Sequence, residues 1–318
     1  MPKRLTKKFL REVCLLNPSP WDDERLRFML RNPTYGELLS YPENFEGTID
    51  YVDMGEGWPD QGNRGTCVGW GVHEAVEISD VLRDQTPEDL SPEDMYNKAR
   101  KYDGLPDWLE GSNNLGAMKA LHKLGICLES CWPTSIDKNV PSVGQQCSDE
   151  DYEGQSKAHG IDAYYTVPLS VGGFKAALWG TTSDPQWGEG IGVPLVIGFK
   201  VPESITAEVD GICPIPEPGE ASLGGHSTII TSWEMIDGHL YWWNPETWGK
   251  DVGLDGVLKL PVEYLTGGWV MDAWVFHYGN AIGPTPSDCT FANTYVDFGN
   301  LVAKVVNSRT RIPSPVRP

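Results

Sequence analysis

The stretch from Gln61 to Ile78 has the residue types and spacing needed for thiol chemistry. Gly62 and Gly65 lie in a loop that ends at Thr66, and apolar residues follow at helical spacing. We expect Thr66 to cap this helix, because its hydroxyl can accept from a free backbone N–H in the first turn. Cys67 would then lie in that turn, where open N–H groups and the helix dipole stabilise a thiolate. The pattern therefore predicts a nucleophilic cysteine.

The alternative interpretation of Cys67 is a small, buried and unreactive packing residue. Three polar residues favour the reactive interpretation. Gln61 precedes Cys67 by six residues, on a loop that could bring its side-chain amide beside the sulfur. His226 follows two glycines that allow close approach, and Asn244 follows an aromatic run.

These four residues would together transfer an acyl group from an amide to water. His226 would take the proton of Cys67 and later give it to the leaving amine, with a thioester between the two steps. Asn244 would fix the imidazole tautomer that faces the sulfur. Gln61 and the backbone N–H of Cys67 would donate hydrogen bonds to the oxyanion.

The order Gln61, Cys67, His226 and Asn244 resembles that of the papain-like cysteine peptidases. The similarity extends over about residues 46–277 and is greater to bacterial members. The segments that carry it besides the four residues are Leu90–Tyr96, Gly125–Pro133, Gly192–Phe199, Pro216–His226 and Gly256–Leu265. The resemblance implies an α+β fold of two lobes. A helical lobe would carry the cysteine, an antiparallel β-barrel-like lobe the histidine and asparagine, and the cleft would lie between them.

The sequence departs from the family pattern at two places. Pro245-Glu246-Thr247 stands between Asn244 and Trp248-Gly249, whereas the family has Asn-Ser-Trp-Gly. These extra residues could move the tryptophan or tilt Asn244. Arg64 stands where secreted members carry a disulfide cysteine.

The chain is expected to contain four parts. Residues 1–45 form an N-terminal extension, either propeptide-like or a docking arm. Residues 46–155 form the helical lobe and 156–279 the β lobe. Residues 280–318 form a proline-containing tail that the family does not need. We consider that this tail docks to a protein assembly partner or a larger particle.

Helix signals precede strand signals along the chain, which favours α+β over alternating βαβ units. Helices are expected near residues 5–16, 67–82, 92–102, 113–124 and 174–178, and a polar loop over 137–154. Strands are expected near residues 49–53, 159–167, 194–201, 228–233, 240–243, 257–260 and 274–278.

Charge and composition exclude several classes of partner. With 318 residues, a net charge of −20 and a pI near 4.6, the chain lacks the basic surface that nucleic acids and anionic membranes require. No apolar run is long enough for a membrane span, and the basic N-terminus lacks a signal-peptide core. No CxxC or HExxH motif occurs, so we expect no metal and no cofactor.

Cysteine usage indicates a reducing compartment such as the cytoplasm. Seven scattered cysteines do not form a disulfide framework, and Cys127 and Cys131 are expected to be packing residues.

Three functions are compatible with these observations. The first is a peptidase that acts on polypeptides. The second is a catalytically silent relative that serves as a structural or binding module, since fold does not fix function. The third is another Cys-His acyl transferase, such as an amidase or a transglutaminase-like enzyme. Other histidines are expected on the surface or in the core: His73, His122, His159, His239 and His277.

Overall fold

The computed structural model describes residues 5–19, 44, 59–82, 86–179 and 194–278. The chain divides into two compact units, Met1–Gly279 and Asn280–Pro318. The second unit lies outside the described residues, as does the strand expected at 49–53. The two expected lobes belong to one compact unit.

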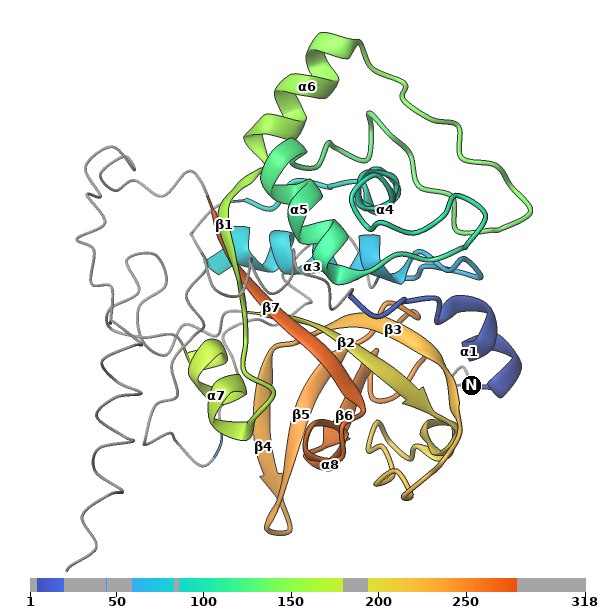
Figure 1. Ribbon diagram of the computed structural model, residues 1–318, viewed down its shortest axis with the longest axis vertical. Coiled ribbons are helices and arrows are strands. Elements are labelled where there is room, and N and C mark those ends of the chain that lie inside the picture. The colour runs from blue at the N-terminus through green and yellow to red at the C-terminus, as the bar shows by residue number, and fades with distance from the viewer. Residues whose placement is uncertain (1–4, 20–43, 45–58, 83–85, 180–193, 279–318) are drawn as a thin grey trace, which may run out of the picture. The chain divides into compact units, whose positions relative to one another are not determined.

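Four helices form the helical side of the fold, and α4, α5 and α6 lie above α3 in Figure 1. Their bounds are Cys67–Leu82 for α3, Pro92–Arg100 for α4, Asn114–Leu124 for α5 and Asp149–Ala158 for α6. The first three match the expected helices. The polar loop expected over 137–154 is wrong at its end, because Ser148 caps α6 by accepting from the Asp151 amide at 3.1 Å. Three acidic residues follow in the first turn of α6, where the helix dipole favours them.

Side-chain caps explain where these helices begin. Ser91 accepts from the Asp94 amide at 3.0 Å, and Asn113 accepts from the Gly116 amide at 2.8 Å. Gly125 ends α5 with a φ of 68°. The cap expected from Thr66 is wrong, since its hydroxyl has no hydrogen-bond partner among the residues described.

The strands form two antiparallel sheets, so the α+β class is confirmed. The four-stranded sheet has the order β1-β7-β2-β3, with β1 at Ile161–Thr166, β7 at Val270–Tyr278, β2 at Leu195–Pro202 and β3 at Ser222–Ile230. The three-stranded sheet contains β4 at Ser232–Ile236, β5 at His239–Pro245 and β6 at Val257–Pro261. The single strand expected at 228–233 is therefore two strands, which meet at Thr231. The remaining elements are α1 at Lys7–Val13, α7 at Val171–Trp179, η2 at Glu203–Ala207 and α8 at Glu263–Thr266.

The four-stranded sheet separates two hydrophobic cores, because successive side chains of a strand point to opposite faces. Val196 of β2 packs with the helical core around α3 and α5. Ile197 and Phe199 pack with the core on the other side, which contains Trp233 and Trp242 of the three-stranded sheet. The helical side and the β side therefore share β2 and β3 as their common wall (Figure 1).

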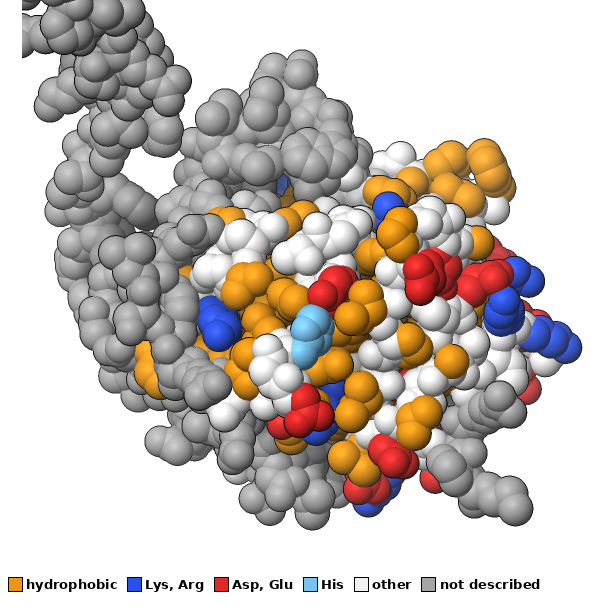
Figure 2. Space-filling view, turned by 90° about the horizontal axis from the view of Figure 1, so that it is seen from below, with side chains coloured by type: hydrophobic (Ala, Val, Ile, Leu, Met, Phe, Trp, Pro, Cys, Tyr) orange, Lys and Arg blue, Asp and Glu red, His pale blue; other side chains and the backbone are white. Residues whose placement is uncertain are grey.

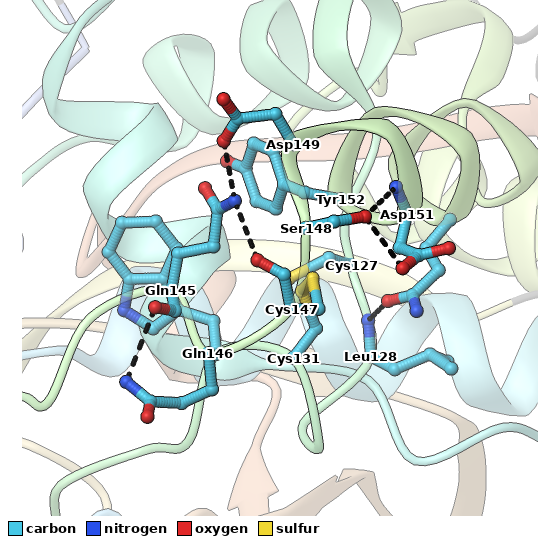
Figure 3. Close-up of a disulfide and its surroundings, with 12 residues drawn as sticks. Cys127, Leu128, Cys131, Gln145, Gln146, Cys147, Ser148, Asp149, Asp151 and Tyr152 are labelled. Carbon is cyan, nitrogen blue, oxygen red and sulfur yellow. Dashed lines mark hydrogen bonds between the residues drawn. A yellow bond between two sulfur atoms is a disulfide. The ribbon is translucent and has the colours of Figure 1, made fainter.

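Within the described residues, a disulfide joins Cys131 to Cys147, so the expectation that Cys131 is a packing residue is wrong (Figure 3). Beside it, the Gln145 amide donates to the Cys147 carbonyl at 3.1 Å and to Asp149 at 2.9 Å. Closing a loop of this length contributes about 3 kcal/mol in the chain-entropy picture. Disulfides are typical of oxidising compartments, so this bond counts against the expected reducing one.

On the face that Figure 2 shows, acidic, basic and apolar side chains are interspersed, without an extended basic patch. Within the described residues, no helix is both long enough and apolar enough to cross a membrane.

A buried ion pair holds α4 to its neighbours. Lys98 Nζ lies 2.6 Å from Asp94 Oδ2 and also donates to the Gly125 carbonyl and the Ser156 hydroxyl. The hydroxyl of Tyr152 donates to Asp94 Oδ1 at 2.7 Å. These bonds join α4, the end of α5 and α6 in one network.

We predict that Lys98→Met lowers the free energy of unfolding by about 3–5 kcal/mol, because it leaves the Asp94 charge buried and unpaired. Urea denaturation measures this. Lys101→Met removes the same charge from an exposed position and should change stability by less than about 0.5 kcal/mol. Equal effects of the two substitutions would contradict the structural role of the pair.

Helix α3 carries a buried acidic group without a hydrogen-bond partner among the described residues, Glu74. Glu74 is 1% exposed, and neither carboxyl oxygen has a hydrogen-bond partner in the described part of the chain. Burial first, and then repulsion from Glu246 and Glu77, raise the pKa of Glu74 well above its ordinary value of 4.5. Because the folded pKa lies above the ordinary one, the contribution of Glu74 to stability is fully present only below the ordinary value of 4.5 and is lost as the pH rises through the folded pKa.

We therefore predict that Glu74→Gln raises the melting temperature over the parent at pH 8 but not at pH 4. Each kcal/mol recovered should add about 2–4 °C in a chain of this size. Thermal unfolding followed by circular dichroism across this range tests it, with the exposed Glu150→Gln as the matched control. A difference that does not depend on pH would rule out the ionisation of Glu74 as its cause.

Candidate active site

Cys67 begins α3 and is completely buried. Gly71, one turn further along the helix, lies directly against β3. A Cβ atom placed on Gly71 would come within 3.1–3.2 Å of Ser227 and Thr228. This close approach brings the first turn of α3 beside His226, the preceding residue of β3.

The His226 imidazole is held from several sides in a fully buried position. Its Nε2 lies 2.8 Å from Glu246 Oε2. The ring of Trp248 lies over it with a centroid distance of 4.4 Å. The thiols of Cys67 and Cys14 lie close enough to this ring to affect its pKa, although Nδ1 makes no hydrogen bond within the described residues. Because Nε2 is used by Glu246, Nδ1 is the nitrogen left for the sulfur atoms.

Three consecutive residues, Glu246, Thr247 and Trp248, hold the site together. Glu246 binds His226, and Trp248 covers the imidazole ring. Thr247 fixes Gln61 through two hydrogen bonds. The Thr247 carbonyl accepts from the backbone amide of Gln61 at 2.8 Å, and the Thr247 hydroxyl donates to the side-chain oxygen Oε1 of Gln61 at 2.5 Å. Gln61 Nε2 is thereby oriented as a donor.

Asn244 is placed differently from the expectation. Its Nδ2 donates to Thr228 Oγ1 at 2.9 Å and to the Ile229 carbonyl at 2.8 Å, which ties β5 to β3. The structure thus brings Gln61, Cys67 and His226 together, while Glu246 takes the position beside the imidazole.

A sequence signal for Glu246 was present. In the family pattern Asn-Ser-Trp-Gly, the orienting residue stands two positions before the tryptophan. Counting back from Trp248-Gly249 gives Glu246, so that Glu-Thr-Trp-Gly replaces the pattern without any insertion.

Electrostatics favour a charged imidazole. Burial alone lowers the pKa of His226, but the Glu246 carboxylate and the neighbouring thiols of Cys14 and Cys67 outweigh it, so that the pKa is raised well above its ordinary value. Burial raises the pKa of Glu246, and attraction to His226 opposes that effect. A cationic imidazole beside Cys67 is the arrangement that supports a thiolate.

The N-terminal segment, here residues 5–19, runs across this site between α3 and β3 (blue in Figure 1). The Leu16 amide donates to the carbonyl of Gly225 at 2.8 Å, and the Asn17 amide donates to that of Ser112 at 2.7 Å. The carbonyl of Val13 accepts from Gln61 Nε2 at 3.4 Å. The segment therefore uses the same amide donor that was expected to bind an oxyanion.

Two further contacts anchor the N-terminal segment beyond the site. The Ser19 hydroxyl donates to the buried Asp272 carboxylate at 2.5 Å. The Leu15 side chain fills the space over Gly65, where a Cβ atom would come within 2.1 Å of it. A pocket of about 390 Å³ remains open beside Leu15, but neither Cys67 nor His226 lines it.

The remaining histidines lie elsewhere, as expected. His73, His159 and His239 each contact a glutamate, respectively Glu77, Glu88 and Glu263. His122 contacts the Ile161 carbonyl, and His277 packs against Tyr165. Among the described residues, no group of three or more acidic, histidine or cysteine side chains could hold a metal ion.

Comparisons with known proteins point to one fold. No family model and no curated protein sequence matches the chain. Solved structures do match. Xylellain, a cysteine protease from Xylella fastidiosa, is 22% identical with a TM-score of 0.68, covering 87% of this chain and 98% of that one.

Two precursor enzymes are similar as well. Procathepsin L 3 from the Tenebrio molitor larval midgut is 16% identical with a TM-score of 0.60, covering 87% of this chain and 83% of that one. Procathepsin B S9 from Trypanosoma congolense is 15% identical with a TM-score of 0.59, covering 87% and 93%. With α3 and β3 meeting at Cys67 and His226, the chain has the fold of the papain-like cysteine proteases.

Proposed function

We propose that this chain is a cysteine peptidase whose site is covered by its own N-terminal segment. The observation that carries this proposal is the buried group of Cys67, His226 and Glu246, in which a carboxylate 2.8 Å from Nε2 leaves Nδ1 for the nucleophile. Fold alone would not support an activity, but this arrangement of groups does.

The proposed reaction begins when the Cys67 thiolate attacks a peptide carbonyl. His226, charged by the proton of Cys67, then gives that proton to the leaving amine and later takes one from the water that hydrolyses the thioester. Glu246 keeps Nδ1 turned toward the sulfur and stabilises the imidazolium. Trp248 keeps water away from this hydrogen bond.

Gln61 completes the site as a donor to the oxyanion. Its Nε2 donates to the Arg64 carbonyl at 2.7 Å and faces the Val13 carbonyl of the N-terminal segment. A substrate carbonyl would take the place of Val13. Such a donor contributes about 3–4 kcal/mol to the stabilisation of a tetrahedral intermediate.

In this proposal, the chain with its N-terminal segment over the site is an inactive precursor. Leu10 of α1 is fully buried in the β-side core, and Leu16 is buried in the helical core. Since both cores contain side chains of the segment, its removal or displacement is required before a substrate can enter.

We predict that Leu10→Ala speeds the alkylation of Cys67 by an epoxide at about pH 6, where only a low-pKa thiolate reacts. Losing a buried leucine weakens docking by about 2–5 kcal/mol, so the rate should rise about tenfold or more. Intact mass measured over time follows the reaction. Lys8→Ala changes an exposed residue of the same helix and should leave the rate unchanged.

The variants Cys67→Ala and His226→Ala identify the reacting group. The first should abolish the adduct and the second should slow its formation. Cleavage of a mixed-sequence fluorogenic peptide library by the Leu10→Ala chain would then support the peptidase. If no adduct forms in any of these chains, the catalytically silent module is the better account.

A pH profile separates the roles of Glu246 and Asn244. Because Glu246 raises the pKa of His226, Glu246→Gln should move the basic limb of kcat/KM to lower pH. The shift should be about one to two pH units, since a hydrogen bond to a charged group contributes about 1.5–3 kcal/mol and one pKa unit corresponds to about 1.4 kcal/mol.

Asn244→Ala should lower stability without moving that limb, because Asn244 binds Thr228 and Ile229. The reverse pattern would assign the orienting role to Asn244. The Leu10→Ala chain provides the background for both variants.

A further inference from the structure

Hydrogen bonds of the residues before and after Cys14 in the sequence hold it over the site. The preceding residue, Val13, gives its carbonyl to Gln61, and Leu16 gives its amide to Gly225. A Cβ atom placed on Gly224 would come within 2.2 Å of the Cys14 carbonyl and 3.1 Å of its Cβ. The backbone of Cys14 therefore lies against β3, two residues before His226.

The Cys14 thiol belongs to the same buried cluster as the nucleophile. Cys14 is 2% exposed and Cys67 is completely buried, and both are free thiols. Both thiols lie close enough to the His226 ring to affect its pKa; Nε2 of the ring is bound to Glu246, and Nδ1 makes no hydrogen bond within the described residues. Both cysteines therefore neighbour the same imidazole, Cys14 from the segment that lies against β3 and Cys67 from the first turn of α3.

We propose that Cys14 and Cys67 form a reversible disulfide when the covered chain meets a hydroperoxide. The bond would lock the N-terminal segment onto the site and protect the nucleophile from irreversible oxidation. Its regulatory meaning rests on the proposed peptidase function, whereas the bond itself does not. The Cys131–Cys147 disulfide shows that the fold already carries one such bond.

The chemistry balances with hydrogen peroxide as the oxidant. The Cys67 thiolate attacks one peroxide oxygen, the O–O bond breaks, and the leaving hydroxide takes the imidazolium proton to give water and a sulfenic acid. His226 then accepts the proton of Cys14, whose sulfur attacks that of Cys67. The departing hydroxide takes the proton back as a second water. Two thiols lose two electrons, and the peroxide gains them.

The two cysteines have different parts in this sequence. Burial raises the pKa of Cys14 to about 11, so Cys14 stays protonated while peroxide reacts and attacks second, after His226 has taken its proton. Cys67 begins a helix beside a cationic imidazole and suits the attacking step. Cys127 and Cys213 are buried elsewhere, beside Asp94 and Tyr264 respectively.

The test uses the full chain carrying Cys289→Ser, treated with hydrogen peroxide, quenched with N-ethylmaleimide and digested without reductant. Mass spectrometry should find one cross-linked peptide pair containing Cys14 and Cys67. Epoxide labelling of Cys67 should fall about tenfold or more and return with dithiothreitol, as expected for a disulfide. Cys213→Ser serves as the matched control and should give the same cross-link.

In Cys14→Ser, the cross-link should be absent, and Cys67 should proceed to the sulfinic acid, which dithiothreitol does not reverse. If the parent chain shows Cys67 sulfinic acid and maleimide-modified Cys14 instead, the proposal is overturned. The mass readout does not require catalysis. A chain that forms the cross-link but never cleaves peptides would therefore refute the peptidase alone, and a chain that cleaves without cross-linking would refute the disulfide alone.

Discussion

The buried contact between His226 and Glu246 is the interaction on which the site depends. Burying a carboxylate or a charged imidazole without a partner costs free energy. Removing either Glu246 or His226 would therefore leave the other as a buried charge without its partner. Their contact also decides which ring nitrogen faces Cys67. Because Glu246 starts the run that continues with Thr247 and Trp248, the same three residues orient the imidazole, the Gln61 amide and the covering indole ring.

The surrounding fold explains how such a site is kept rigid. Helix α3 can lie close to β3 because Gly71 has no side chain to separate them, and β3 is shared by both hydrophobic cores. Asn244 fastens β5 to β3 just before Glu246, which fixes the direction from which the carboxylate arrives. The asparagine thus supports the site through the backbone and not through the imidazole.

Local patterns were enough to predict the helix that carries Cys67, and they brought Gln61, Cys67 and His226 into one hypothesis, but the strand expected at 228–233 left His226 outside it, whereas β3 begins at Ser222. They failed where side-chain direction decides the outcome. Glu246 was missed because Asn244 matched the expected residue type, and only the structure shows its amide turned toward Thr228. Helix α6 was missed because it buries little beyond Ser156 and so has no apolar periodicity. The partner of Cys131 could not be chosen, since spacing does not reveal which cysteines meet.

The way in which the N-terminal segment binds has a consequence for how long it can keep the site closed. Its hydrogen bonds to Gly225 and Ser112 use backbone carbonyls, which any extended peptide could use equally well. What distinguishes the segment is the burial of Leu10 and Leu16 and its covalent tether, which raises its effective concentration at the site. A cut anywhere between the segment and α3 would turn it into a separate ligand, whose occupancy of the site would then depend on its concentration and on the burial of Leu10 and Leu16.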